Sequence, residues 1–186
     1  MNKRHVTLLV FLDLSSAFDT IDHTVLLRRI EDKFVFCGTV LEWFRLYLSS
    51  RFQQVVIEGA TSDKFDISFG VPQGSGLGLL LFSIYTSQLF DIVTQHLPTV
   101  HCYADDTKMY LAFRPGARAS QDSALAAMEA CIRDVREWMI NDKLKINDVK
   151  SEFILIGTQA QLKKVDSDNL VVGDSCISPS TDSIRN

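Results

Sequence analysis

Aspartates at the ends of apolar segments are the residues of this 186-residue chain with the clearest potential for chemistry. Asp13 directly follows the apolar run Val6–Leu12, and Asp105 and Asp106 form a tight acidic link between two short apolar segments. Burying a charged carboxylate at such a position costs free energy unless a cation compensates the charge. Carboxylate oxygens are suitable ligands for Mg²⁺ or Mn²⁺. If the two segments are neighbouring strands, Asp13 and Asp105 could share two ions, as two-metal phosphoryl transfer requires.

Each aspartate also has a purely structural explanation. Asp in loops most often serves as a turn residue or a helix cap. Taken by itself, Asp13 is better explained in this way, and so is an isolated Asp-Asp pair. The net charge of −4 excludes a uniformly basic nucleic-acid-binding protein. It does not exclude a polymerase core, in which carboxylates gather around metal ions.

The elements that must position these residues follow from the apolar pattern. Val6–Leu12 is predicted to be a strand buried on both faces. Other runs rich in β-forming residues predict strands over 100–103, 107–112 and 153–156 and hairpins over 52–69 and 170–177. Helices are predicted from an Asp22 cap to about Lys33, after a Thr39–Glu42 capping box, over 79–93, and after a Ser120 cap. Strands and helices interleave without strict alternation, which favours the α+β class.

Composition is that of a globular protein. The chain is 46% hydrophobic and 23% charged. Its longest apolar runs fall well short of the ~20 residues that span a membrane, and no signal peptide is recognisable. We therefore expect an intracellular protein without membrane association. The four cysteines form no CxxC pair and are expected to be reduced and buried.

Two further groups of side chains have simple explanations. Trp43 and Trp138 are expected to be core or helix-packing residues. The basic cluster of Arg28, Arg29 and Lys33 either contacts nucleic-acid phosphates or forms an exposed helix face. Neither group, by itself, indicates a catalytic function.

Four ordered segments carry a resemblance to a known family. Residues 11–23, FLDLSSAFDTIDH, closely resemble motif A of reverse transcriptases from non-LTR (LINE-type) retrotransposons. Residues 70–75, GVPQGS, resemble motif B, and residues 103–106, YADD, resemble motif C. Residues 144–147 with 150–157 resemble motif D. Four motifs in order over nearly the whole chain are far more specific than YADD alone.

The resemblance implies a polymerase palm. The expected fold is an antiparallel sheet of about four strands with helices packed on one face, an incomplete right-hand reverse transcriptase fold. Strand Val6–Leu12 should lie beside the hairpin over 100–112. The implied activity is that of an RNA-directed DNA polymerase with Mg²⁺ or Mn²⁺ as cofactor. Its partners would be an RNA template, a DNA primer and deoxynucleoside triphosphates, and a functional element would work in the nucleus. The sequence leaves the oligomeric state open.

The same resemblance assigns catalytic roles. Asp13 and Asp105 would be the principal metal ligands, with Asp106 contributing less directly and the Leu14 carbonyl as an additional ligand. Lys150 matches the motif D lysine, a candidate general acid for the leaving pyrophosphate. The alternative for Lys150 is an ordinary solvated lysine.

Substrate contacts are implied for four other residues. Gln73 and Gly74 match the loop that lies against the templating base and incoming nucleotide, where a glycine lets the backbone approach its ligand closely. Tyr103 of the YADD box is likewise expected to contact the substrate. Phe18 matches the aromatic gate that packs under the sugar and rejects a 2′-hydroxyl, a role compatible with a core position.

Some features depart from the family pattern. Gly76 stands where a larger residue is usual and Leu79 replaces a proline, which should loosen the turn into the next helix. Only twelve residues precede Asp13, and the end of the chain resembles the start of the primer-grip hairpin. Residues 1–186 are therefore expected to be a partial domain in which fingers and thumb are missing.

Three functions remain in competition. The leading interpretation is a reverse transcriptase fragment of a non-LTR retrotransposon. The alternative is a catalytically inactive retroelement remnant that acts, if at all, as a nucleic-acid or protein interaction module. An RRM-like binding module ranks last, because the acidic pair between Tyr103 and Tyr110 would repel phosphate without metal. We expect this chain alone to fold at least partly but not to polymerise.

Overall fold

A computed structural model describes residues 5–72, 74–97, 99–103, 106–166, 168–173 and 175–179, and divides the chain into two compact units. Unit 1 contains residues 1–15, 88–141 and 145–186, and unit 2 contains residues 16–87 and 142–144. In the described ranges, no helix combines the length and the apolar character that crossing a bilayer would demand.

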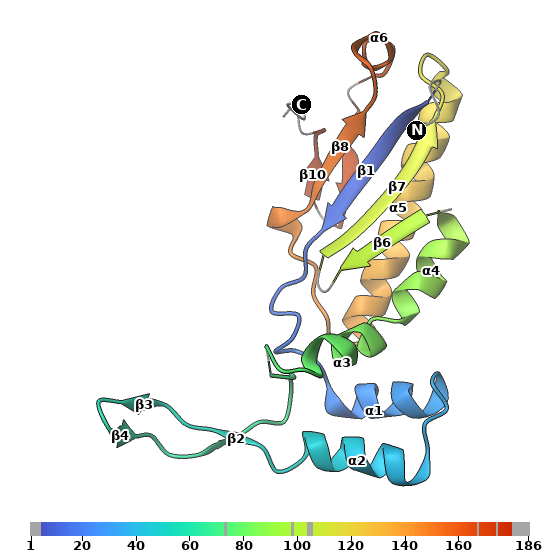
Figure 1. Cartoon of the computed structure of the whole chain (residues 1–186). Helices are drawn as coiled ribbons and strands as arrows, with labels where there is room; N and C mark the ends of the chain where they lie inside the picture. Colours follow the sequence, from blue (N-terminus) through green and yellow to red (C-terminus); the bar gives the residue numbers. More distant parts are fainter. Residues whose placement is uncertain are drawn as a thin grey trace. The chain divides into compact units, whose positions relative to one another are not determined.

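Unit 1 is built on a four-stranded antiparallel sheet with the strand order β6-β7-β1-β8 (Figure 1). The central strand β1 (Val6–Leu12) pairs with β7 (Asp106–Phe113) on one side and with β8 (Glu152–Ile156) on the other. Strand β6 (Thr99–Tyr103) completes the sheet by pairing with β7. The prediction that β1 lies beside the β6–β7 hairpin is confirmed.

One face of this sheet is covered by helices. Helix α4 (Gln88–His96) and the long helix α5 (Arg118–Asn141) pack together behind β6 and β7 (Figure 1). Side chains of β1 alternate between this buried face and a partly exposed face. The prediction that β1 is buried on both faces is therefore wrong: only every second residue contributes to the core, as in a sheet covered on one side.

The described part of unit 1 contains four shorter elements as well. The 3₁₀ turn η1 (Asp148–Lys150) precedes β8, and helix α6 (Gln159–Leu162) follows it. Strands β9 (Leu170–Val172) and β10 (Ser175–Ile177) form the predicted hairpin, and β9 packs against α5.

Unit 2 consists of three helices and a long hairpin. Helix α1 (His23–Asp32) packs against α2 (Gly38–Leu48) and α3 (Gly78–Tyr85). The hairpin pairs β2 (Phe52–Gln53) with β5 (Phe65–Asp66) and β3 (Val56–Ile57) with β4 (Ala60–Thr61). It extends away from α2 (Figure 1). The predicted hairpin over 52–69 is thus present, but it is built from short strands: the expected strand Phe52–Ile57 is interrupted, and the expected strand Phe65–Phe69 ends at Asp66. The α+β class is as predicted.

Helix boundaries depart from the sequence predictions in three places. The segment 79–93 is not one helix but two, α3 and α4, because the chain leaves the helix at Thr86. Helix α2 already begins at Gly38 with Cys37 as its N-cap, so the Thr39 capping box is wrong. Helix α5 begins at Arg118, and the Ser120 hydroxyl instead accepts a hydrogen bond from the Arg114 amide.

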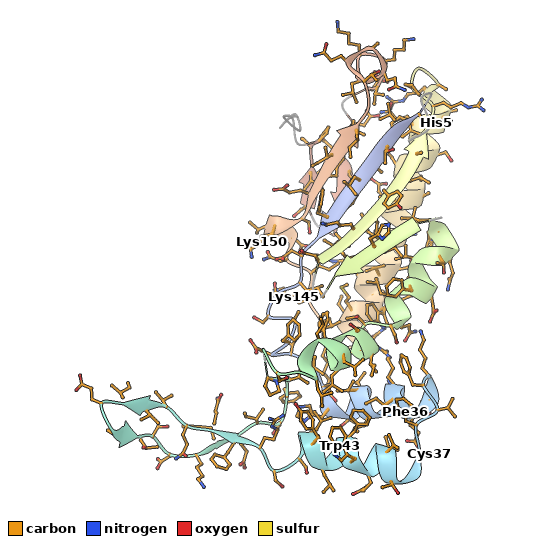
Figure 2. The ribbon with its side chains drawn as sticks, viewed as in Figure 1. His5, Phe36, Cys37, Trp43, Lys145 and Lys150 are labelled. Carbon is orange, nitrogen blue, oxygen red and sulfur yellow. The ribbon has the colours of Figure 1, made fainter. Side chains whose placement is uncertain are left out.

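Burial also corrects several expectations. Cys131 is buried, but Cys37 and Cys176 are exposed, and the Cys102 side chain lies outside the described residues. Trp138 is buried as expected, whereas Trp43 is 49% exposed and stacks on Tyr47 (Figure 2).

Candidate active site

Two acidic residues meet at one end of the unit 1 sheet. Leu12 of β1 lies opposite Thr107 of β7, so Asp13 directly follows this pair and Asp106 directly precedes it. Both residues line a groove of about 400 Å³. The other residues that line it are Phe11, Leu12, Thr107, Val149, Lys150 and Glu152. Asp105 lies outside the described residues, so the prediction that it shares ions with Asp13 stays a prediction.

The oxygen donors of this groove fit a divalent cation. The Asp13 side chain is 25% exposed and Asp106 is exposed, so both carboxylates are accessible from the groove. In the described part of the chain, no cluster of three or more His, Cys, Asp or Glu side chains could hold a metal ion. Two carboxylates suffice for the kind of site in which substrate phosphates and water complete the shell of Mg²⁺.

Two residues of the segment that resembles motif D reach the Asp13 carboxylate. Lys150 Nζ lies 3.5 Å from Asp13 Oδ2, and Figure 2 shows Lys150 at the end of the sheet where β1 finishes. Asn147 Nδ2 donates a hydrogen bond of 3.2 Å to the same oxygen. Lys150 therefore lies at the acidic end of the sheet, and its role as a general acid stays a prediction. Asn147 was not among the predicted site residues.

Backbone pairing holds this segment in place. The Asn147 amide donates to the Asp13 carbonyl (2.8 Å), and the Ser15 amide donates to the Lys145 carbonyl (2.9 Å). Leu14 is buried and forms an isolated antiparallel bridge with Ile146. The chain after β1 is therefore paired with residues 145–147, which fixes the backbone around Leu14.

In unit 2, the rest of motif A packs against motif B. The Val71 amide donates to the Phe18 carbonyl (2.9 Å), and the Gly70 amide donates to the Ile21 carbonyl (2.8 Å). Gly70 has a φ of +80°, and a Cβ there would lie 3.0 Å from backbone atoms of Asp19. Only glycine fits this position without strain. Phe18 is half-buried and stacks on Phe82 with ring centroids 4.8 Å apart.

The glycines in and just after the motif B loop are favoured at their positions for different physical reasons. Gly74 has a φ of +74°, a backbone conformation that favours glycine. A Cβ at this position would have no atom within 4 Å, so the space beside Gly74 is open. A Cβ at Gly78 would lie 2.7 Å from the Pro72 carbonyl oxygen. Gln73 and the Tyr103 side chain lie outside the described residues.

Asp22 and His23 have structural roles within unit 2, and the predicted Asp22 cap of α1 is confirmed. Asp22 caps α1 by accepting from the amides of Thr24 (2.8 Å) and Val25 (3.1 Å), and it forms an ion pair of 2.5 Å with Lys143. Burial acts to raise the pKa of the Asp22 carboxyl, but these hydrogen bonds outweigh it and hold the pKa below the usual 3.8. The His23 ring contacts the Gly70 carbonyl at 2.8 Å.

The basic cluster of α1 is largely structural. Arg29 is buried and forms an ion pair with Asp142, and Lys33 donates to the Ser87 carbonyl (3.0 Å). Arg28 is exposed. The hypothesis that this cluster as a whole contacts phosphates is therefore wrong for Arg29, whose charge is already compensated.

Comparison with known proteins identifies the class to which this fold and site belong. Residues 1–179 match the family model described as "Reverse transcriptase (RNA-dependent DNA polymerase)". Because the match covers almost the whole chain, the protein belongs to the reverse transcriptase family.

The similar sequences come from mobile elements. The chain is 27% identical over 159 residues to the RNA-directed DNA polymerase from mobile element jockey of Drosophila melanogaster, covering 81% of this chain and 16% of the relative. It is 29% identical over 144 residues to the probable RNA-directed DNA polymerase from transposon X-element of the same species, covering 76% and 15%. The resemblance to non-LTR retrotransposons is thereby confirmed, and the chain spans about a sixth of these relatives' length.

Solved structures support the fold. The apo telomerase of Candida tropicalis, truncated from its C-terminal domain, matches with a TM-score of 0.60 and 16% identity, covering 93% of this chain and 34% of the other. The telomerase of Candida albicans matches with a TM-score of 0.51 and 9% identity, covering 93% and 29%. At these identities the likeness concerns the fold, that of a partial reverse transcriptase palm.

Proposed function

We propose that this chain is the palm portion of an RNA-directed DNA polymerase, which extends a DNA primer on an RNA template with deoxynucleoside triphosphates. The observation that carries the proposal is the position of Asp13 and Asp106 at the same end of the paired strands β1 and β7, with Lys150 3.5 Å from Asp13. Membership of the reverse transcriptase family supports it. A functional element would act in the nucleus.

In this proposal the acidic end of the sheet binds metal. Asp13, Asp105, Asp106 and the Leu14 carbonyl would hold two divalent cations, Mg²⁺ or Mn²⁺. When bound, such ions activate the attacking hydroxyl and stabilise the leaving oxygen of a phosphoryl transfer. Asn147 supports this role by fixing one oxygen of Asp13 with its amide (3.2 Å).

The remaining residues of the proposed site act on the nucleotide. Lys150 would donate a proton to the leaving pyrophosphate, and its 69% exposed side chain is free to turn from Asp13 toward a phosphate in the groove. Phe18, held by its stack on Phe82, would exclude a ribose 2′-hydroxyl. Gln73, Gly74 and Tyr103 would contact the template base and the incoming nucleotide.

Primer extension tests the proposal. The chain is expressed within the longest polypeptide that its reading frame encodes and assayed with an RNA template, a DNA primer and Mg²⁺ or Mn²⁺. We expect extension that Asp13→Asn and Asp105→Asn abolish and that Asp32→Asn, at an exposed position of α1, leaves intact. Extension that survives both active-site substitutions would reject the proposal. Tight duplex binding by a folded polypeptide without extension would instead support the inactive interaction module.

The 186-residue chain alone is expected to give no measurable extension. The chain spans about a sixth of its relatives' length, and the positioning of reactants, which contributes on the order of 7–11 kcal/mol to catalysis, would need more of the polymerase than this. Losing most of that contribution slows the reaction by several powers of ten. Extension by the chain alone that disappears in Asp105→Asn would contradict this expectation.

A further inference from the structure

Arg136 of α5 forms a two-pronged ion pair with the turn that carries Lys150. Its Nη1 donates to Asp148 Oδ1 (2.5 Å) and its Nη2 donates to Asp148 Oδ2 (2.8 Å). The side chains of Arg136 and Asp148 are only 25% and 28% exposed. Paired, charge-assisted hydrogen bonds of this kind fix orientation as well as distance. The ion pair therefore fixes Asp148 in both position and direction.

The turn of the β9–β10 hairpin confines Arg136 from a second direction. A Cβ on Gly173 would lie 2.4 Å from Arg136 Cζ and 2.7 Å from its Nη2, far inside normal contact distance. Gly173 also has a φ of +61°, which favours glycine. The guanidinium group is thus held between a hairpin turn and the Asp148 carboxylate.

The turn that Arg136 holds has few other anchors. No residue of η1 is buried, and Val149 is 95% exposed. Apart from the Arg136 pair, the described polar contacts of η1 itself are the Lys150–Asp13 ion pair of 3.5 Å and two local backbone bonds, from the Lys150 and Ser151 amides to the Asn147 and Asp148 carbonyls. At the ends of the turn, Asn147 bonds to Asp13, and the Ser151 hydroxyl donates to the Asn147 carbonyl. Because no apolar burial stabilises the turn, the Arg136 pair is a major constraint on where Lys150 lies.

We propose that Arg136 is a positioning residue: through Asp148 it fixes the turn so that Asn147 and Lys150 face the Asp13 carboxylate. Its catalytic consequence rests on the proposed function, whereas its structural consequence does not. Lysine cannot replace Arg136, because a single ammonium group cannot make the two parallel bonds. Gly173 contributes to the same arrangement, because any side chain at this position would displace the Arg136 guanidinium.

Amide hydrogen exchange tests the structural part on the chain itself. Arg136→Met and the milder Asp148→Asn should each accelerate exchange of the Asn147 amide, which donates to the Asp13 carbonyl, by about tenfold or more relative to the core of β1. Arg133→Met is the matched control, since Arg133 lies on the same helix but is 73% exposed. Unchanged protection of Asn147 in both variants, or equal acceleration in the control, would overturn the proposal.

Kinetics test the catalytic part in the longer polypeptide used for primer extension. Arg136→Met should lower kcat by about tenfold to a hundredfold, the scale of a misplaced catalytic group, with little change in the KM for primer. In a Lys150→Met background the same substitution should have a clearly smaller effect, because the part of the Arg136 effect that acts through Lys150 is already lost. An equal loss of kcat in both backgrounds would overturn this coupling. A parent enzyme without extension would contradict the proposed function, and the exchange experiment would still decide whether Arg136 holds the turn.

Discussion

Substitution of Asp142 by asparagine should destabilise unit 2 strongly. Arg29 Nη2 lies 2.5 Å from Asp142 Oδ2, and the two side chains are only 7% and 8% exposed. Arg29 also donates to the Tyr85 carbonyl, and the Tyr85 hydroxyl donates to the Asp142 carbonyl. The variant keeps the backbone contacts but removes the buried negative charge that pairs with the Arg29 guanidinium. Breaking a buried ion pair in this way costs about 3–5 kcal/mol.

The structure suggests a direct assay for this loss. Trp43 lies in unit 2 and Trp138 lies in unit 1, so single-tryptophan variants report urea unfolding of each unit separately. With a denaturant slope of about 1–3 kcal/mol/M, the unit 2 midpoint should fall by at least about 1 M. Glu31→Gln, at an exposed position of α1, is the control.

A double variant separates the cost of a lone charge from the value of the pair. Arg29→Met with Asp142→Leu removes both charges, and it should lose less stability than Asp142→Asn alone, because no unpaired charge stays buried. An Asp142→Asn midpoint no lower than that of Glu31→Gln would refute the reasoning. So would a double variant less stable than the single one.

Three further outcomes are expected. Phe18→Val, in the longer polypeptide, should admit ribonucleotides while leaving deoxynucleotide use largely intact; unchanged discrimination would leave Phe18 as a core residue only. Gly70→Ala should lower the free energy of unfolding by about 1–3 kcal/mol, because φ is +80° and the new Cβ would meet the Asp19 backbone. In thermal unfolding, this loss of stability should exceed that of Gly76→Ala, where the space for a Cβ is open. Hydrogen bonds from Arg136 hold the pKa of Asp148 below 3.8, against the opposing effect of burial. The ionised Asp148 carboxylate therefore stabilises the fold above pH 3.8, and this stabilisation is lost as the pH falls through the lowered pKa. Urea midpoints measured from about pH 5 to about pH 2 should therefore fall less steeply for Asp148→Asn than for the parent.

The sheet was predictable because its strands are short apolar runs bounded by charged or turn residues. Val6–Leu12 agrees with the sequence prediction at both ends. Its burial was not predictable from the run itself, because a continuous apolar sequence does not reveal whether helices cover one face or two. The half-exposed positions of β1 lie on the face that α4 and α5 leave uncovered.

Helix α2 shows that periodicity carried more information than residue type. Leu41, Phe44 and Leu48 are its buried residues, at steps of three and four. Trp43 lies between them and is therefore directed outward, although a tryptophan in a helix suggests packing. Counting from Leu41 would have predicted the exposure of Trp43. The exposed Cys37 precedes α2 as its N-cap and has no comparable signal.

Only part of the candidate site could be derived from the sequence. That Asp13 and Asp106 lie at one end of the sheet follows once β1 and β7 are recognised as antiparallel neighbours. Lys150 came from the resemblance to motif D. Asn147 had no signal, because it is 134 residues from Asp13 and asparagine is common in turns. Arg136 had none either, since a helix pattern does not show which surface arginine meets a carboxylate.

The segment 143–147 contacts one aspartate of motif A in each of the two units. In unit 1, Asn147 donates to Asp13; in unit 2, Lys143 pairs with Asp22 at 2.5 Å. Between these positions, Leu144 and Ile146 are buried. The buried residues secure the backbone of the segment, and the polar residues that flank them, Lys143 and Asn147, contact the two aspartates. Asp22 thereby holds the start of α1, and Asp13 is held in the orientation in which its carboxylate lines the groove.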